Sequence, residues 1–250
     1  RLRRKVGAPP IVRGRLDHRP RLPVMTPLAA ALKARFEEAP RAPLIVTGPE
    51  GVGKATLLLH AMMTQQVKGA MCLYLSLSNE PVRSADAFVR LFVDRSGFLV
   101  SPANSILVRS LLRTRPDKSR ISEEDIEKAF KTIEIALTME RNAGWKHGVP
   151  VICIEETHLR ARDMIEFKDP LIGRFLEWCG HLSLNHLAHV VFVASIRAAK
   201  TLEREPGWQY VRDLMFVDFP NARRARQLLA QVLLSEDDQD MVLEKLGGDT

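Results

Sequence analysis

A glycine-rich turn between an apolar run and an amphipathic run limits the folds open to this chain more than any other segment. The apolar run is Leu44–Thr47, and the turn has the spacing Gly48, four residues, Gly53 and Lys54. Apolar side chains then recur at helical spacing, at Leu57, Leu58, Ala61 and Met62. Such glycines let backbone N–H groups surround an anion, while the helix start and the lysine supply positive charge. The pattern predicts a phosphate-binding loop (P-loop); the alternative is a glycine turn that binds nothing.

The ligand expected in this loop is a nucleotide, ATP or ADP. Magnesium normally uses a Ser or Thr hydroxyl directly after the lysine, and this chain has Ala55 there. Thr56 follows, but one helical step turns it about 100° away, so we do not expect it to replace the hydroxyl. Nucleotide binding without magnesium is therefore possible. The expected contacts are Gly48, Pro49, Glu50, Gly51, Val52, Gly53, Lys54, Ala55 and Thr56.

A second candidate segment consists of four apolar residues followed by two acids, Val151–Glu156. An aspartate at the first acidic position usually assists magnesium, and the glutamate after it polarises the attacking water. Here Glu155, which is one methylene longer, stands first and Glu156 stands second. Ligands bind at the carboxyl edge of an α/β sheet, so Glu156 is the candidate catalytic base and Glu155 a weak magnesium ligand. The alternative is two solvated acids at a strand end.

A third candidate segment is Val190–Ser195, an apolar run that ends in a small polar residue. ATPases place a phosphate sensor at the end of such a strand, which makes Ser195 the candidate sensor. Arg197 follows closely, and a γ-phosphate contact is weighed against the ordinary interpretation, a solvated arginine.

Apolar runs alternate with longer amphipathic runs along the chain and predict a parallel α/β sheet. Continuous rather than alternating apolar strands, separated by helices, are typical of a sheet covered on both faces. The expected strands are Leu44–Thr47, Met71–Leu77, Val149–Ile154, His189–Ala194 and Leu214–Phe219. A first helix is expected to start near Thr26. The other expected helices are Lys54–Val67, Ala85–Arg95, Pro102–Arg113, Glu123–Ala143, Pro170–Leu182, Ala222–Leu234 and roughly Gln239–Leu246. Within Glu123–Ala143, the side chains expected on the buried face are Ile126, Phe130, Ile133 and Leu137.

Charge is distributed unevenly over the 250 residues, whose formal net charge is +7. The arm formed by residues 1–24 holds eight basic side chains and one acid, so the remaining residues are neutral overall. This excludes a uniformly basic nucleic-acid-binding domain. The predicted organisation is a Pro/Arg-rich extended arm (1–24), an α/β domain (25–219) and a short helical segment (220–250). Cys72, Cys153 and Cys179 lie in apolar stretches, where buried reduced thiols are expected, and no apolar run approaches the roughly 18 residues of a membrane helix.

The three segments Gly48–Lys54, Glu155–Glu156 and Ser195, in this order, resemble the AAA+/STAND branch of P-loop NTPases. More narrowly, Asn185–Ser195 looks like the sensor strand of the mitochondrial escape protein family, and the resemblance extends over roughly residues 40–235. It implies a five-stranded AAA+-like sheet in which 220–250 form a truncated lid. It also implies a location in the mitochondrial matrix or at the matrix face of the inner membrane, and an Arg-rich start fits a transit-peptide cleavage region.

Three functions remain open at this stage. The leading hypothesis is a nucleotide-binding pseudo-ATPase, a structural or accessory subunit whose partners are protein subunits of a large mitochondrial assembly. The second is an active ATPase that acts on nucleic acid or protein. The third is a nucleic-acid-binding adaptor that uses residues 1–24. In the leading hypothesis the arm contacts protein subunits, with RNA or anionic lipid as the alternatives.

Overall fold

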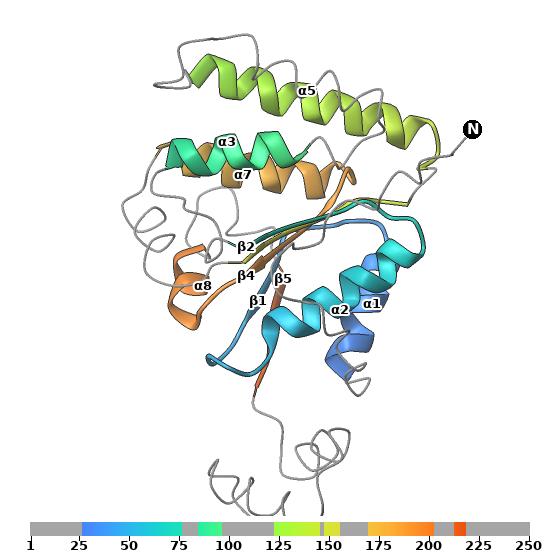
Figure 1. Ribbon diagram of the computed structural model, residues 1–250, viewed down its shortest axis with the longest axis vertical. Helices are drawn as coiled ribbons and strands as arrows, with labels where there is room; N and C mark the ends of the chain where they lie inside the picture. Colours follow the sequence, from blue (N-terminus) through green and yellow to red (C-terminus); the bar gives the residue numbers. More distant parts are fainter. Residues whose placement is uncertain are drawn as a thin grey trace, which may run out of the picture.

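The computed structural model describes residues 27–76, 85–96, 123–145, 148–155, 170–202 and 213–218. Helices and strands alternate through these segments (Figure 1). In chain order they are α1 (Pro27–Glu37), β1 (Leu44–Thr47), α2 (Lys54–Val67), β2 (Cys72–Ser76), α3 (Ala85–Ser96), α5 (Glu123–Asn142), β3 (Val151–Glu155), α7 (Pro170–Leu184), β4 (His189–Val193), α8 (Ile196–Leu202) and β5 (Asp213–Phe216).

The described strands form one parallel sheet of five strands in the order β2-β3-β4-β1-β5. Every residue of β1 and β4 is buried, which explains why their sequences are continuous apolar runs rather than alternating ones. The predicted parallel α/β sheet is therefore confirmed. The side chains of each strand alternate between two faces, so Ile45 packs in one core cluster while Leu44 and Val46 pack in another.

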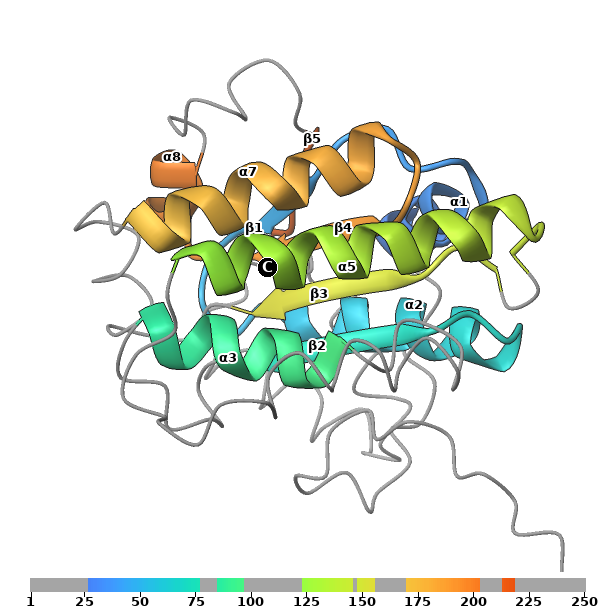
Figure 2. The ribbon, with the colours of Figure 1, turned by 90° about the horizontal axis from the view of Figure 1, so that it is seen from above.

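Helices cover both faces of this sheet (Figures 1 and 2). On one side α3 and α7 lie against the strands, and α5 packs on these two helices as the outermost helix. The short helix α8 belongs to this side, because Ala198, Ala199 and Leu202 pack in the same cluster. On the other side α1 and α2 pack together, with Leu32 and Leu58 fully buried.

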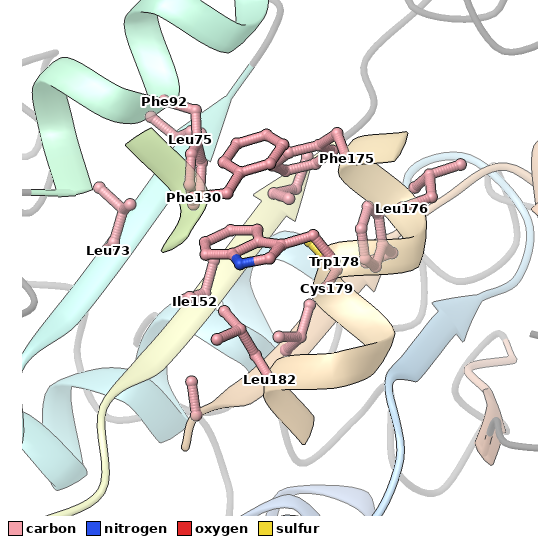
Figure 3. Close-up of a cluster of buried hydrophobic side chains, with 14 of the residues drawn as sticks. Leu73, Leu75, Phe92, Phe130, Ile152, Phe175, Leu176, Trp178, Cys179 and Leu182 are labelled. Atoms are coloured by element: carbon pink, nitrogen blue, oxygen red, sulfur yellow. The ribbon is translucent and has the colours of Figure 1, made fainter. Parts of the chain in front are cut away.

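Aromatic side chains form the centre of the larger core, between α3, α5 and α7. Phe130 of α5 stacks on Trp178 of α7, with ring centroids 4.5 Å apart and planes 10° from parallel, and Figure 3 shows the two rings side by side. Phe92 and Phe88 of α3 each approach Phe175 edge to face at 4.9 Å. Such pairs stabilise by about 0.5–1.5 kcal/mol beyond their buried area. The contacts fix the outer helix over the sheet.

The predicted buried face of α5 is confirmed, because Ile126, Phe130, Ile133 and Leu137 are all between 0% and 6% exposed. All three cysteines are buried thiols, as expected. None of the described helices is both long and apolar enough to cross a membrane.

Most predicted boundaries differ from the observed ones by one or two residues, and β1 and α2 match fully. The largest shift is at β5, which ends at Phe216, so the predicted extension to residue 219 is wrong. Helix α8 was not predicted. The predicted helices at 102–113, 222–234 and 239–246, the arm 1–24 and the segment 220–250 lie outside the described residues.

Candidate functional site

The candidate site lies between two neighbouring strands whose following helices pack on opposite faces of the sheet. Strands β1 and β4 are neighbours, but α2 leaves β1 toward one face while α8 leaves β4 toward the other. In open α/β sheets ligands bind outside the carboxyl ends of the strands at such a switch point. The P-loop follows β1 and Ser195 follows β4, so two of the three predicted segments meet here. Glu155 ends β3, the next strand along the sheet.

The first glycine of the loop is required by close packing against Val217, the residue that follows β5. Gly48 has a φ of 147°, which only glycine adopts readily, and a Cβ at this position would lie 1.9 Å from the Val217 carbonyl oxygen. Val217, the residue after β5, is also bound to the strand that precedes the loop, since its N–H donates to the Thr47 carbonyl over 2.7 Å. The chain directly after the edge strand therefore packs against the start of the loop.

The end of the loop leaves the first N–H groups of α2 without a side-chain acceptor. Gly53 caps the helix in the left-handed conformation, with φ 85°, and a glycine cap offers no side-chain acceptor to the first helical N–H groups. The first turn, Lys54–Leu57, carries no acidic residue. The positive end of the helix dipole thus stays uncompensated by side chains of that turn.

Lys54 folds back over the loop that precedes it. Its ammonium donates to the carbonyl oxygens of Gly48, over 2.8 Å, and of Pro49, over 2.6 Å. Burial lowers the pKa of Lys54, and the charges of Glu50 and Glu155 act in the opposite direction. These contacts hold a cation against the first two residues of the loop.

Tyr74 of β2 holds the carboxylate of Glu155. The phenol donates to Oε2 of Glu155 over 2.5 Å. The register pairs Tyr74 with Cys153, so Glu155 stands two residues further on the same face of the sheet. Burial, then the nearby Cys153 and the hydrogen bond to Glu155, raises the pKa of Tyr74. The phenol therefore keeps the proton that it donates.

The positions that this fold uses for magnesium offer few oxygen ligands. A hydroxyl and a carboxylate normally hold it beside the phosphates. Ala55 contributes no oxygen, Thr56 lies on the exposed side of α2, and one oxygen of Glu155 already accepts a hydrogen bond. Among the described residues, no three His, Cys, Asp or Glu side chains gather into an alternative metal site.

Ser195 caps helix α8. Its Oγ accepts the Ala198 N–H over 3.2 Å, and its carbonyl accepts the Ala199 N–H over 2.8 Å, which is the usual N-cap arrangement. Its hydroxyl proton is not used in that bond and could be donated, so the sensor role stays a prediction. Arg197 lies exposed on α8. The candidate base Glu156 lies outside the described residues.

Two residues of this site escaped the sequence prediction, Tyr74 and Val217. Each contacts a site residue that belongs to another strand or its loop. Tyr74 binds Glu155, and Val217, directly after β5, packs against Gly48. The only sequence signal was the position of Tyr74 in an expected strand, which does not reveal its partner strand.

No family model matches the sequence, and no curated protein matches it. Solved structures do resemble the fold. The ORC2 protein of Aeropyrum pernix, solved as ADPNP–ADP complexes, matches with a TM-score of 0.51 and 14% identity over 85% of this chain and 52% of its own. AMPPCP-bound DnaA from Aquifex aeolicus matches at 0.47 and 16%, over 86% and 54%. Pif1 helicase from Candida albicans matches at 0.37 and 13%, over 86% and 46%.

The chain thus spans about half the length of these neighbours. The similarity to ORC2, together with the all-parallel sheet and the P-loop, shows that the chain has the fold of an AAA+-type P-loop NTPase. The fold predicted from the order of the three segments is confirmed.

Proposed function

We propose that this chain binds ATP or ADP through its P-loop and hydrolyses the nucleotide slowly or not at all. The observation that carries the proposal is the loop itself. Three glycines with positive φ (48, 51 and 53) turn the backbone at the switch point, and the Lys54 ammonium binds the carbonyl oxygens of Gly48 and Pro49 at the start of the loop. Backbone N–H groups, an acid-free helix start and a cation form a cradle for phosphates.

Weak hydrolysis follows from the magnesium ligands. Magnesium neutralises the charge that moves during phosphoryl transfer and holds the leaving group in place. Without the hydroxyl at Ala55, and with Glu155 bound to a phenol, this chain lacks the usual means of holding the ion. If turnover occurs, Glu156 acts as the base that orients water and Ser195 as the contact to the γ-phosphate.

In the wider role that we propose, the chain is an accessory subunit of a large mitochondrial assembly. Support comes from the basic arm, which holds the entire net charge of the chain, and from the resemblance to the mitochondrial escape protein family. The arm would contact acidic surfaces of protein subunits, with RNA or anionic lipid as the alternatives. An active ATPase of the genome-maintenance type is the competing proposal, which the intact Glu156 favours.

Calorimetric titration of the full chain with ATP and ADP tests the binding. We expect one site per chain, abolished by Lys54→Ala and retained by Lys68→Ala. The control removes the same charge at the far end of α2, about 20 Å away, where Lys68 pairs with Glu37. Equal binding by both variants would place the nucleotide elsewhere. Steady-state turnover like that of ordinary ATPases would contradict the pseudo-ATPase and favour its competitor.

A further inference from the structure

The bond between Tyr74 and Glu155 lies on the same face of the sheet as the P-loop helix. Tyr74 and Cys153 pack in the core cluster that includes Leu58 and Met62 of α2. Glu155 follows Cys153 by two residues, so its carboxylate lies on that face as well, near enough to Lys54 to influence its pKa. The carboxylate and the phenol bound to it therefore lie on the face of the sheet that α2 covers.

The position of β2 sets the direction in which the phenol holds the carboxylate. In the order β2-β3-β4-β1, β2 and the P-loop strand lie on opposite sides of β3. Neighbouring strands are about 4.8 Å apart, so Glu155 begins about 10 Å from the end of β1. A bond to Tyr74 draws the carboxylate toward the outer edge of the sheet, away from the phosphates that the loop would hold.

A metal ion at the phosphates would have to compete with this bond. Hydrogen bonds between a hydroxyl and a carboxylate are short and strong, and the 2.5 Å separation is at the short end of their range. No hydroxyl at Ala55 offsets the loss of the carboxylate. Without the metal ion, the cation left to pair with the terminal phosphate would be the Lys54 ammonium, which binds the carbonyl oxygens of Gly48 and Pro49 at the start of the loop.

We propose that Tyr74 is a positioning residue that withholds Glu155 from the phosphates, so that this P-loop takes nucleotide free of divalent cation. The inference rests on the proposed nucleotide binding and adds the form of the ligand. In this proposal Tyr74 acts through Glu155, so loss of the phenol changes the effect of magnesium on ATP binding. If Tyr74 had a purely structural role, loss of the phenol would weaken the fold and leave the effect of magnesium unchanged.

The test is a comparison of ATP dissociation constants measured in MgCl2 and in EDTA on the full chain. For the natural sequence we expect the two constants to agree within about twofold. Removing the phenol with Tyr74→Phe should make ATP bind about tenfold tighter with magnesium than without, since a hydrogen bond to a charged group no longer has to be broken. In the double variant Tyr74→Phe/Glu155→Gln the two constants should agree again.

Glu155→Asp provides an independent variant if Tyr74→Phe unfolds, as judged by thermal denaturation. The shorter carboxylate cannot keep the same bond to the phenol, so magnesium should again tighten ATP binding. If the natural chain already binds ATP about tenfold tighter with magnesium, the inference about Tyr74 is overturned while the proposed nucleotide binding stands. The same holds if the variants fold but show no gain in magnesium dependence. No ATP binding in either buffer would overturn the proposed function and the inference together.

Discussion

Replacing Gly48 by alanine probes the contact between the P-loop and Val217, the residue after β5. The added Cβ would lie 1.9 Å from the Val217 carbonyl oxygen and 2.9 Å from its carbon, both backbone atoms. The φ of 147° adds strain of about 1–3 kcal/mol for a non-glycine residue. Displacing packed backbone costs about 1–3 kcal/mol more. We therefore expect the free energy of unfolding to fall by about 3 kcal/mol or more.

Two other glycines provide matched controls for the same substitution. Gly51 has a φ of 78° but open space around its Cβ position, so Gly51→Ala should cost only the backbone strain, about 1–2 kcal/mol. Gly173 lies inside α7, with nothing within 4 Å, and Gly173→Ala should stabilise by about 0.5–1 kcal/mol.

Urea denaturation followed by circular dichroism measures all three glycine variants against the natural chain. The expected order of stability is Gly173→Ala highest, then Gly51→Ala, then Gly48→Ala, with unchanged dependence on urea concentration. If Gly48→Ala were as stable as Gly51→Ala, the close approach of Val217 to the loop would be refuted.

Further predictions address the metal site, the core and a buried histidine. Ala55→Thr restores a magnesium ligand and should raise ATP hydrolysis or magnesium-dependent affinity, and unchanged values of both would argue against the missing hydroxyl as the cause. Trp178→Ala removes the ring stacked on Phe130 and should destabilise by about 3–5 kcal/mol in urea denaturation; a cost below about 1 kcal/mol would contradict the core described. Burial lowers the pKa of His189 to about 4, and Arg35 acts in the same direction. The unfolded chain therefore binds more protons between about pH 6.5 and pH 4, and stability should fall by about 3 kcal/mol across that window as pH falls. His189→Phe should lose this part of the pH dependence, and an unchanged pH profile would show that His189 does not cause it.

The local part of the fold could be read from the sequence. The P-loop with its strand and helix combines glycine spacing, an apolar run and helical periodicity within 24 residues, and β1 and α2 begin and end where predicted. Helix α8 escaped prediction because it spans only seven residues, about two turns, which is too short for a clear period. Its N-cap, Ser195, directly follows an apolar run, where a small polar residue also fits a phosphate sensor.

The long-range part of the site could not be read in this way. Tyr74 and Glu155 are 81 residues apart, and their contact depends on the pairing of β2 with β3 in one register. The contact of Val217 with Gly48 depends likewise on β5 lying beside β1. Periodicity reveals which face of a strand is buried but not which strand lies next to it. The end of β5 was misplaced because Val217 is apolar and buried although the strand has ended.

Hydrogen–deuterium exchange of the full chain, with and without ATP in EDTA, observes the P-loop amides themselves. Phosphates held by backbone N–H groups slow the exchange of those groups, because each must lose its partner before it exchanges. We expect ATP to slow exchange across residues 48–56, with no slowing there in Lys54→Ala. Unchanged exchange at 48–56 under saturating ATP, or slowing confined to other segments, would contradict the proposal that this loop binds nucleotide.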